Sequence, residues 1–361
     1  MAARFRHNPF LANPFPRDLL PAKQDARAFH RTLPGYAPSP LVDLAPLAAE
    51  LGVGRLLLKD ESKRFGLNAF KGLGASYAIH RVMQASPATK SWTFATATDG
   101  NHGRAVAWSA KRLGQKAVVF VPSNTVPARI DAIRGEGAEV IVVPGTYDDT
   151  VKRAADDAKK NGWQVISDTA WPGYMEIPGW IMSGYATIFE EAMEQHPGGF
   201  DAIFLQAGVG GLAYAGVIHA IAAKKKPALI CVEPTDADCL LESILSPDGS
   251  IRIAKGKQNS IMAGLNCGTP SLLAWPAIRA ATEFFLAVDD SYAEDAMRRL
   301  AKAKVVSGES GAAGLAGLLA LAQDPALAAE RALLPLGPLS TVLLISTEGD
   351  TDAVNYRKIV G

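Results

Sequence analysis

The sequence predicts an α/β fold of two three-layer α/β/α domains with mostly parallel twisted sheets. In the middle of the chain, short runs rich in β-branched residues alternate with helical patterns, which is typical of parallel sheets. A second alternating set follows further along the chain. With 361 residues, 48% of them hydrophobic, the chain is long enough to form two cores.

The predicted elements follow one another from residue 41 onward. Residues 1–40 are rich in Pro, Asn and Phe without a sustained period, so we expect an extended arm laid over the body or over a neighbouring subunit. A helix over 41–51, a strand over 54–59 and a helix over 72–83 come next. The first alternating set has strands over 92–97, 117–121, 139–143 and 164–167 and helices near 104–113, 127–134 and 148–161. The second set has strands over 202–206, 229–233, 284–288 and 342–346 and helices near 180–193, 212–224, 292–303 and 312–322.

We assign residues 1–75 and 195–361 to a large domain and residues 76–194 to a smaller α/β domain. Two α/β units of this size leave a cleft between them. Because α/β proteins bind ligands beyond the carboxyl ends of their strands, we expect the active site in that cleft.

Composition and charge exclude several classes of protein. A net charge of +1 with 20% charged residues gives no electrostatic bias toward nucleic acid or membranes. The N-terminus lacks the apolar run of an export signal, so we expect a cytoplasmic protein. The cysteines Cys231, Cys239 and Cys267 lack the paired spacing of a zinc site, and no metal is predicted. We interpret them as idle thiols, with a bridge between Cys239 and Cys267 as the alternative.

Lys71 occupies an unusual place, next to the bulky Phe70 and just before Gly72 and Gly74 at the start of a predicted helix. Apolar and small neighbours would desolvate its ammonium and lower its pKa, which is the condition for a lysine that forms Schiff bases. The alternative is a solvated lysine in a surface loop.

A second polar stretch, Thr98-Asp99-Gly100-Asn101-His102, follows a predicted strand and opens a helix. The free backbone amides of a helix start favour an anion, so the stretch is suited to a carboxylate. The alternative is an ordinary capped helix start. Asp99, Asn101 and His102 together are more polar chemistry than a cap requires.

The third stretch, Gly208-Val209-Gly210-Gly211-Leu212, is a glycine turn between a strand and a helix, which suits a phosphate. Gly208, Gly210 and Ala213 also fit the dinucleotide fingerprint, and Glu233 ends the next strand where a ribose-binding acid is expected. An NAD-dependent oxidoreductase is therefore an alternative of another class. It leaves Lys71 and the stretch around Asp99 unexplained.

Two more strand ends project polar groups toward the same cleft. Ser346 and Thr347 end the last strand with hydroxyls, and Asp168 follows a strand of the first set. An aspartate at a strand end is more often only a turn former. A desolvated lysine, a phosphate cradle, a carboxylate-binding helix start and a terminal hydroxyl together suit pyridoxal phosphate.

Six stretches resemble the motifs of the diaminopropionate ammonia-lyase family, which belongs to the fold type II (tryptophan-synthase-β-like) pyridoxal-phosphate enzymes. These stretches are Asn68-Ala69-Phe70-Lys71, Ala97-Thr98-Asp99-Gly100-Asn101-His102-Gly103-Arg104, Asp168-Thr169-Ala170-Trp171, Ile261-Met262-Ala263-Gly264-Leu265, Ser307-Gly308-Glu309-Ser310-Gly311 and Ser346-Thr347-Glu348-Gly349-Asp350-Thr351-Asp352. The resemblance runs from about residue 40 to the end of the chain.

The resemblance implies a role for each cofactor-binding residue. Lys71 would form the aldimine beside Phe70, and Asn101 would hydrogen-bond the ring oxygen. Gly208, Val209, Gly210, Gly211 and Leu212 would hold the phosphate. Ser346 would face the pyridine nitrogen, with Thr347 as the second candidate. A hydroxyl does not hold that nitrogen protonated, so the electron sink is weaker and elimination is favoured over transamination.

The implied reaction is elimination of ammonia from D- and L-2,3-diaminopropionate, giving pyruvate and a second ammonia. The α-proton lies on opposite faces in the two enantiomers, so Lys71 would serve as base on one face and Asp99 on the other. Asp168 would bind the second amino group, with Thr98 and His102 as further substrate contacts. A serine or threonine dehydratase or a β-replacement enzyme, which has no need of Asp99, is the alternative within this chemistry, and a non-catalytic sensor is another. The family also implies a homodimer.

Overall fold

Two sheets organise the protein. The computed structural model describes residues 3–22, 25–87, 89–98, 100–145 and 147–361. The larger sheet has seven strands in the order β1-β10-β9-β8-β11-β3-β2. Their bounds are β1 Arg4–His7, β2 Leu41–Asp43, β3 Arg55–Asp60, β8 Ala202–Gln206, β9 Ala228–Pro234, β10 Phe284–Val288 and β11 Thr341–Ser346. Its five inner strands are parallel, while the edge strands β1 and β2 pair antiparallel to their neighbours.

The smaller sheet has four parallel strands in the order β6-β5-β4-β7. They are β4 Thr93–Ala97, β5 Lys116–Pro122, β6 Glu139–Val143 and β7 Gln164–Val165. Helices connect the parallel strands of both sheets, as such connections require.

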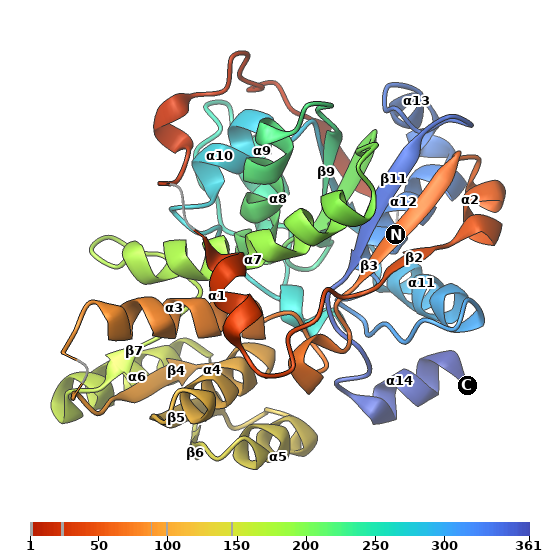
Figure 1. Cartoon of the computed structure of the whole chain (residues 1–361). Coiled ribbons are helices and arrows are strands. Elements are labelled where there is room, and N and C mark those ends of the chain that lie inside the picture. Colours follow the sequence, from red (N-terminus) through yellow and green to blue (C-terminus); the bar gives the residue numbers. More distant parts are fainter. Residues whose placement is uncertain (1–2, 23–24, 88, 99, 146) are drawn as a thin grey trace.

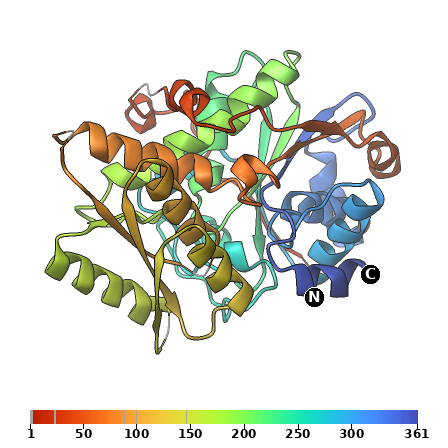
Figure 2. The same cartoon turned by 60° about the horizontal axis from the view of Figure 1, so that its bottom comes forward.

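The helices are α1 Ala26–Thr32, α2 Ala45–Leu51, α3 Gly72–Gln84, α4 Asn101–Arg112, α5 Pro127–Gly135, α6 Tyr147–Asn161, α7 Glu176–Gln195, α8 Gly211–Ala222, α9 Cys239–Leu245, α10 Trp275–Ala281, α11 Asp290–Lys302, α12 Ala313–Gln323, α13 Ala328–Ala332 and α14 Ala353–Val360. Figure 1 shows α3 and α7 side by side between the two sheets, with the smaller sheet at the lower left. In the turned view of Figure 2, the C-terminal helix lies on the side of the larger sheet. None of the helices in the described ranges has the length and apolar character that crossing a membrane needs.

The prediction of an α/β fold with mostly parallel sheets is confirmed, and the strands of both alternating sets lie where the periodicity indicated, within a few residues. The helix predicted over 41–51 is wrong in its first part, because β2 occupies Leu41–Asp43 and pairs with β3 before α2 begins. The described part of the predicted arm lies over the body of its own chain, where β1 adds to the edge of the larger sheet, but the arm is not extended throughout, because α1 occupies Ala26–Thr32. No disulfide joins Cys231, Cys239 and Cys267, so the alternative of a bridge between Cys239 and Cys267 is wrong for this structure.

Alternation along the strands explains the two-sided burial of the larger sheet. On β11, Val342 and Leu344 belong to one hydrophobic cluster, and Leu343 and Ile345 belong to the other. A parallel sheet covered on both faces buries every position, which is why these strands are continuous apolar runs. The second cluster continues through α7 and α3 to Phe94 on the smaller sheet. The two sheets therefore share one apolar core on the side where they face each other.

Four buried charges join β3 to α7 beneath this core. The Arg64 guanidinium donates to both carboxylate oxygens of Glu61, at 2.7 and 2.8 Å, and to both of Glu191, at 3.1 and 2.7 Å. The Lys59 ammonium lies 2.8 Å from a Glu191 oxygen. Two cations face two anions, so the group is neutral. This balance is what makes four charges tolerable away from water.

Removing one member of this network should cost far more than removing a surface ion pair. We expect Arg64→Ala to lower the free energy of unfolding by about 3 kcal/mol or more, because two buried carboxylates lose their donor. The matched control is Arg55→Ala at the start of β3, where the exposed Arg55–Asp43 pair should contribute less than about 1 kcal/mol. Urea unfolding followed by tryptophan fluorescence measures both variants. Equal losses would contradict the structural role of the network.

A buried histidine in α1 predicts loss of stability in acid. His30 bonds Thr187 Oγ1 through Nδ1 at 2.8 Å and Leu73 O through Nε2 at 2.9 Å, and burial lowers its pKa to about 4. As the pH falls, the unfolded chain therefore binds the proton before the folded chain does. The contribution of neutral His30 to the free energy of unfolding is fully present above pH 6.5 and is lost as the pH falls toward 4, by roughly 3 kcal/mol in all. His30→Gln should flatten the pH dependence of the urea midpoint in this window. His80→Gln, at a half-buried position in α3 where burial also lowers the histidine pKa, should flatten it to a smaller extent.

Candidate active site

The loop that carries Lys71 leaves β3 of the larger sheet with an uncommon backbone. Phe65 and Asn68 take positive φ values of 54° and 60°, which non-glycine residues seldom adopt. The surrounding structure holds this strain: the Asn68 amide donates to Asp350 at 3.0 Å, the Gly349 N–H donates to Asn68 O at 2.9 Å, and the Phe70 N–H donates to Thr347 O at 3.1 Å. These bonds fasten the loop to the end of β11 and place Lys71 at the start of α3.

The Lys71 ammonium lies between an anion and two aromatic rings. Its Nζ is 2.7 Å from Asp168 Oδ2, 5.5 Å from the centre of the Phe70 ring and 5.9 Å from that of Tyr185. Burial does act to lower the pKa of Lys71, as the sequence predicted, but the Asp168 carboxylate outweighs it and raises that pKa above its ordinary value. The prediction of a lowered pKa is therefore wrong for the amine in this arrangement.

Asp168 follows β7 of the smaller sheet, so the ion pair joins a loop of one sheet to a loop of the other. His102 Nδ1 faces the same Asp168 oxygen at 3.8 Å, while its Nε2 donates to Ile166 O at 2.9 Å. Burial alone would raise the pKa of Asp168, but Lys71 and then His102 lower it well below its ordinary value. The carboxylate is thus kept ionised and ready to accept a cation.

The start of α4 is capped by a side chain that the sequence assigned to substrate. Thr98 Oγ1 accepts from the N–H groups of Gly100 and Gly103, at 3.0 and 3.2 Å, and the residue is buried. A methyl group at Gly103 would lie 2.2 Å from Thr98 Cγ2, so this turn requires glycine. Asp99, the predicted second base, lies outside the described residues. The substrate contacts predicted for Thr98 and His102 stay predictions.

Asn101, at the first position of α4, donates its amide to the buried Glu348 carboxylate just beyond β11. The other Glu348 oxygen accepts from the Ser310 N–H at 3.1 Å. This contact ties the smaller sheet's helix to the larger sheet beside Lys71. Glu348 lies within one of the sequence motifs, but it was not predicted as a site residue, because the residues that it contacts lie far away along the chain.

The glycine loop forms a cradle at the start of α8. Gly210 has φ +98°, and a methyl group there would lie 2.7 Å from Ile278 Cδ1, while one at Gly208 would lie 2.7 Å from the Cys267 sulfur. Within the described part of the chain, the N–H groups of Gly211, Leu212 and Ala213 have no protein acceptor. The loop therefore presents backbone donors at a helix N-terminus, as a phosphate requires.

The hydroxyls at the end of β11 are buried. Ser346 Oγ lies 2.8 Å from Ser307 Oγ, and Thr347 Oγ1 accepts from Gln206 Nε2 at 3.4 Å. The strand ends thus place both residues between the Lys71 loop and β8. Which of the two faces a cofactor ring stays a prediction.

Glu233 is not the ribose-binding acid that the oxidoreductase alternative needs. Its side chain is fully buried, and its two oxygens accept from the N–H groups of Leu240 and Leu241, both at 2.8 Å. The carboxylate therefore caps α9. With both oxygens engaged inside the protein, the dinucleotide alternative loses the acid on which it depended.

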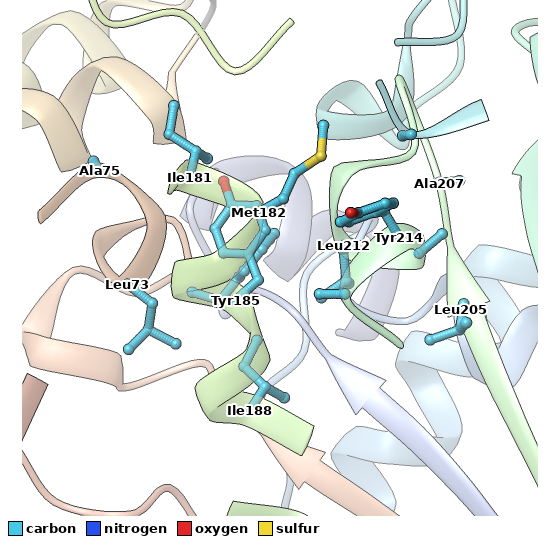
Figure 3. Close-up of a cluster of buried hydrophobic side chains, with 14 of the residues drawn as sticks. Leu73, Ala75, Ile181, Met182, Tyr185, Ile188, Leu205, Ala207, Leu212 and Tyr214 are labelled. Carbon is cyan, nitrogen blue, oxygen red and sulfur yellow. The ribbon is translucent and has the colours of Figure 1, made fainter. Parts of the chain in front are cut away.

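Tyr185 belongs to the site although the sequence did not single it out. Figure 3 shows it on α7 between Leu73 on one side and Leu212 on the other, within the shared core. It is 1% exposed, and the centre of its ring lies 4.7 Å from that of Phe70 and 5.9 Å from Lys71 Nζ. A tyrosine inside an apolar helix is typical core, so no local signal distinguishes it.

The comparisons with known proteins agree with this geometry. A model of the pyridoxal-phosphate dependent enzyme family matches residues 32–337. The diaminopropionate ammonia-lyase of Escherichia coli K12 is 44% identical over 93% of this chain and 90% of its own length. The chain belongs to the diaminopropionate ammonia-lyase family. Fold class and cofactor class follow from that membership.

Two solved structures of the diaminopropionate ammonia-lyase of Escherichia coli superpose along the whole chain. The holo form has a TM-score of 0.92 at 40% identity, covering 100% of this chain and 97% of the other. A complex with an aminoacrylate-PLP azomethine reaction intermediate has a TM-score of 0.91 at 41% identity, with the same coverage. These similarities cover every loop described above.

The residues present fit pyridoxal phosphate, the cofactor of the diaminopropionate ammonia-lyase family. Lys71 supplies an amine for its aldehyde, and the first turn of α8 supplies N–H donors without protein acceptors for its phosphate. The glycines leave the space that a Cβ would fill. The buried Tyr185 ring borders this space, since a Cβ at Gly211 would lie 3.6 Å from Tyr185 Cε2.

A side chain in the cradle should weaken cofactor retention. We expect Gly208→Ala to raise the dissociation constant for pyridoxal phosphate about ten-fold or more, because the added methyl group would push on Cys267 and move the loop. The control is Gly135→Ala, where nothing lies within 4 Å of the added atom. Absorbance of the bound cofactor after dialysis measures both variants. Full retention by Gly208→Ala would remove this loop from the phosphate site.

Proposed function

We propose that this chain eliminates ammonia from 2,3-diaminopropionate, of either hand, and so forms 2-aminoacrylate, which hydrolyses to pyruvate and a second ammonia. The observation that carries the proposal is the meeting of Lys71 Nζ and Asp168 Oδ2 at 2.7 Å, where the loops of the two sheets converge. It supports a site that holds an amine against a carboxylate. Membership in the diaminopropionate ammonia-lyase family supports the substrate.

Pyridoxal phosphate, when bound, supplies the carbonyl that condenses with amines and the ring that accepts electrons from the α-carbon. In the proposal, Lys71 holds the cofactor beside Phe70, Asn101 faces the ring oxygen, and residues 208–212 hold the phosphate. Ser346, or Thr347 beside it, faces the ring nitrogen. The positions of these residues at the strand ends and helix starts around Lys71 support the assignments, and mutation of each residue tests its role.

Asp168 is proposed to bind the substrate's second amino group as an ammonium. Its pKa is held low, chiefly by Lys71, although burial opposes this. An ionised carboxylate keeps the neighbouring amine protonated, so the leaving group departs as neutral ammonia. A serine or threonine hydroxyl could not form this ion pair, which favours a diaminopropionate lyase over a serine or threonine dehydratase.

Proton removal from the α-carbon requires bases on two faces. We propose the Lys71 amine, once released from the cofactor, for one face and Asp99 for the other. The role of Asp99 rests on the family resemblance and on its place between Thr98 and Gly100 at the start of α4. His102 and Thr98 are proposed to line the substrate's side of this turn.

The domain boundaries near residues 75 and 195 are also a proposal. The larger sheet draws its strands from 4–60 and 202–346, and the smaller sheet from 93–165, which supports a division between them. A homodimer, which the family resemblance implies, and a cytoplasmic location both stay predictions.

The two-base proposal predicts a selective defect. Asp99→Asn should lose roughly a hundred-fold or more in kcat/KM toward one enantiomer of diaminopropionate and far less toward the other, because only one face loses its base. Pyruvate release from each enantiomer, coupled to a colour reaction, measures this. Lys71→Ala serves as control: it should show no cofactor that borohydride fixes to the protein. Equal losses toward both enantiomers would show that Asp99 is not specific to one face.

A further inference from the structure

The loop that carries Asp168 is fastened back onto its own strand by one tyrosine. Tyr174 Oη accepts from the Ser167 N–H at 2.9 Å and donates to Val165 O at 3.0 Å. One hydroxyl therefore satisfies a donor and an acceptor on the two sides of Ile166, at the end of β7. The residue that follows Ser167 is Asp168.

The same loop is closed at its far end by backbone and ring contacts. The Tyr174 N–H donates to Trp171 O at 2.8 Å and the Trp171 N–H donates to Tyr174 O at 3.3 Å. The rings of Trp171 and Tyr174 stack, with centroids 4.1 Å apart and planes 12° from parallel. The ring of Tyr174 thus holds the closed loop together, while its hydroxyl ties that loop to the strand.

The backbone on both sides of Asp168 has few other anchors. The Ile166 N–H donates to Ala95 O at 2.8 Å, Ile166 O accepts from His102, and the Thr169 N–H donates to Ser167 Oγ at 3.3 Å. The direction of the Asp168 carboxylate toward Lys71 therefore depends on where Ser167 is held. Burial raises the pKa of Tyr174, so its hydroxyl keeps its proton and its bond to Val165 O over the working range.

We propose that Tyr174 is a positioning residue that sets the Asp168 carboxylate for the substrate's second amino group. The inference rests on the proposed function, since it requires Asp168 to bind an ammonium. Tyr174 lies outside the sequence motifs. It would act through the end of β7, without touching the substrate. A displacement of about 1 Å at such a group is enough to cost catalysis, because the ion pair and its hydrogen bond are directional.

The test compares two substrates that differ only at the leaving group. β-Chloroalanine has the same α-amino and carboxylate groups as diaminopropionate, but it loses chloride and a proton instead of ammonia. Its elimination gives 2-aminoacrylate, hydrogen chloride and, after hydrolysis, pyruvate and ammonia. It offers no ammonium to Asp168, so a defect in Asp168 placement should spare it.

Tyr174→Phe keeps the stacked ring and removes only the hydroxyl. We expect kcat/KM for diaminopropionate to fall roughly ten- to a hundred-fold, while that for β-chloroalanine stays within about two-fold. Absorbance of the bound cofactor should be unchanged. The matched control is Tyr77→Phe in α3, whose hydroxyl accepts from Arg81 at 3.1 Å away from the Asp168 loop; both substrates should keep their wild-type values.

Asp168→Asn separates this inference from the proposed function. It should show the same selectivity for diaminopropionate, and more strongly. If Asp168→Asn lost activity toward both substrates equally, the proposed contact between Asp168 and the substrate ammonium would be contradicted. The proposed role of Tyr174, which depends on that contact, would be contradicted as well. If Asp168→Asn were selective but Tyr174→Phe had wild-type values or lost both activities equally, only the positioning role of Tyr174 would be overturned.

Discussion

The Lys71–Asp168 ion pair is the interaction on which the site depends. Lys71 comes from the loop after β3 of the larger sheet, and Asp168 follows β7 of the smaller one, 97 residues further along. Each charge alone would be costly to hold in a largely desolvated place. Bringing the two loops together satisfies both charges at once. The same contact sets the protonation of each group, because each raises or lowers the other's pKa in favour of the charged form.

The two loops meet because each is fixed by different means. The lysine loop contains two strained residues, Phe65 and Asn68, and is held by bonds to the end of β11 and by the buried charges around Arg64. The Asp168 loop has no such network. It is folded back on β7 by a tyrosine hydroxyl and a stacked pair of rings. The strained loop before Lys71 and the folded-back loop around Asp168 together set one distance, that between Nζ and Oδ2.

Local sequence patterns predicted most of the fold and the polar residues at the strand ends of the site. Alternating apolar runs predicted the strands of both sheets, and glycine turns predicted the cradle before α8, because these signals are confined to a few neighbouring residues. The direction of the Lys71 pKa shift could not be predicted in this way. Its immediate neighbours, Phe70 and Gly72, indicate desolvation, whereas the deciding anion lies in another sheet. The sequence did not identify Glu348 and Tyr185 as site residues for the same reason, because their contacts are with residues distant in the sequence.

Competition for one carboxylate oxygen connects this geometry to substrate choice. Asp168 Oδ2 is occupied by the Lys71 ammonium when the lysine is free. If Lys71 held the cofactor covalently, this ammonium would be absent, and the partly buried Asp168 carboxylate would keep only His102 Nδ1 facing it at 3.8 Å as a possible cation. In the proposed function, a substrate with a second ammonium would restore this ion pair, and a substrate with a hydroxyl would not. Under the proposed function, selection of a diamino acid would follow from the charge that the site lacks once Lys71 is engaged, and it would require the end of β7 to hold Asp168 in place.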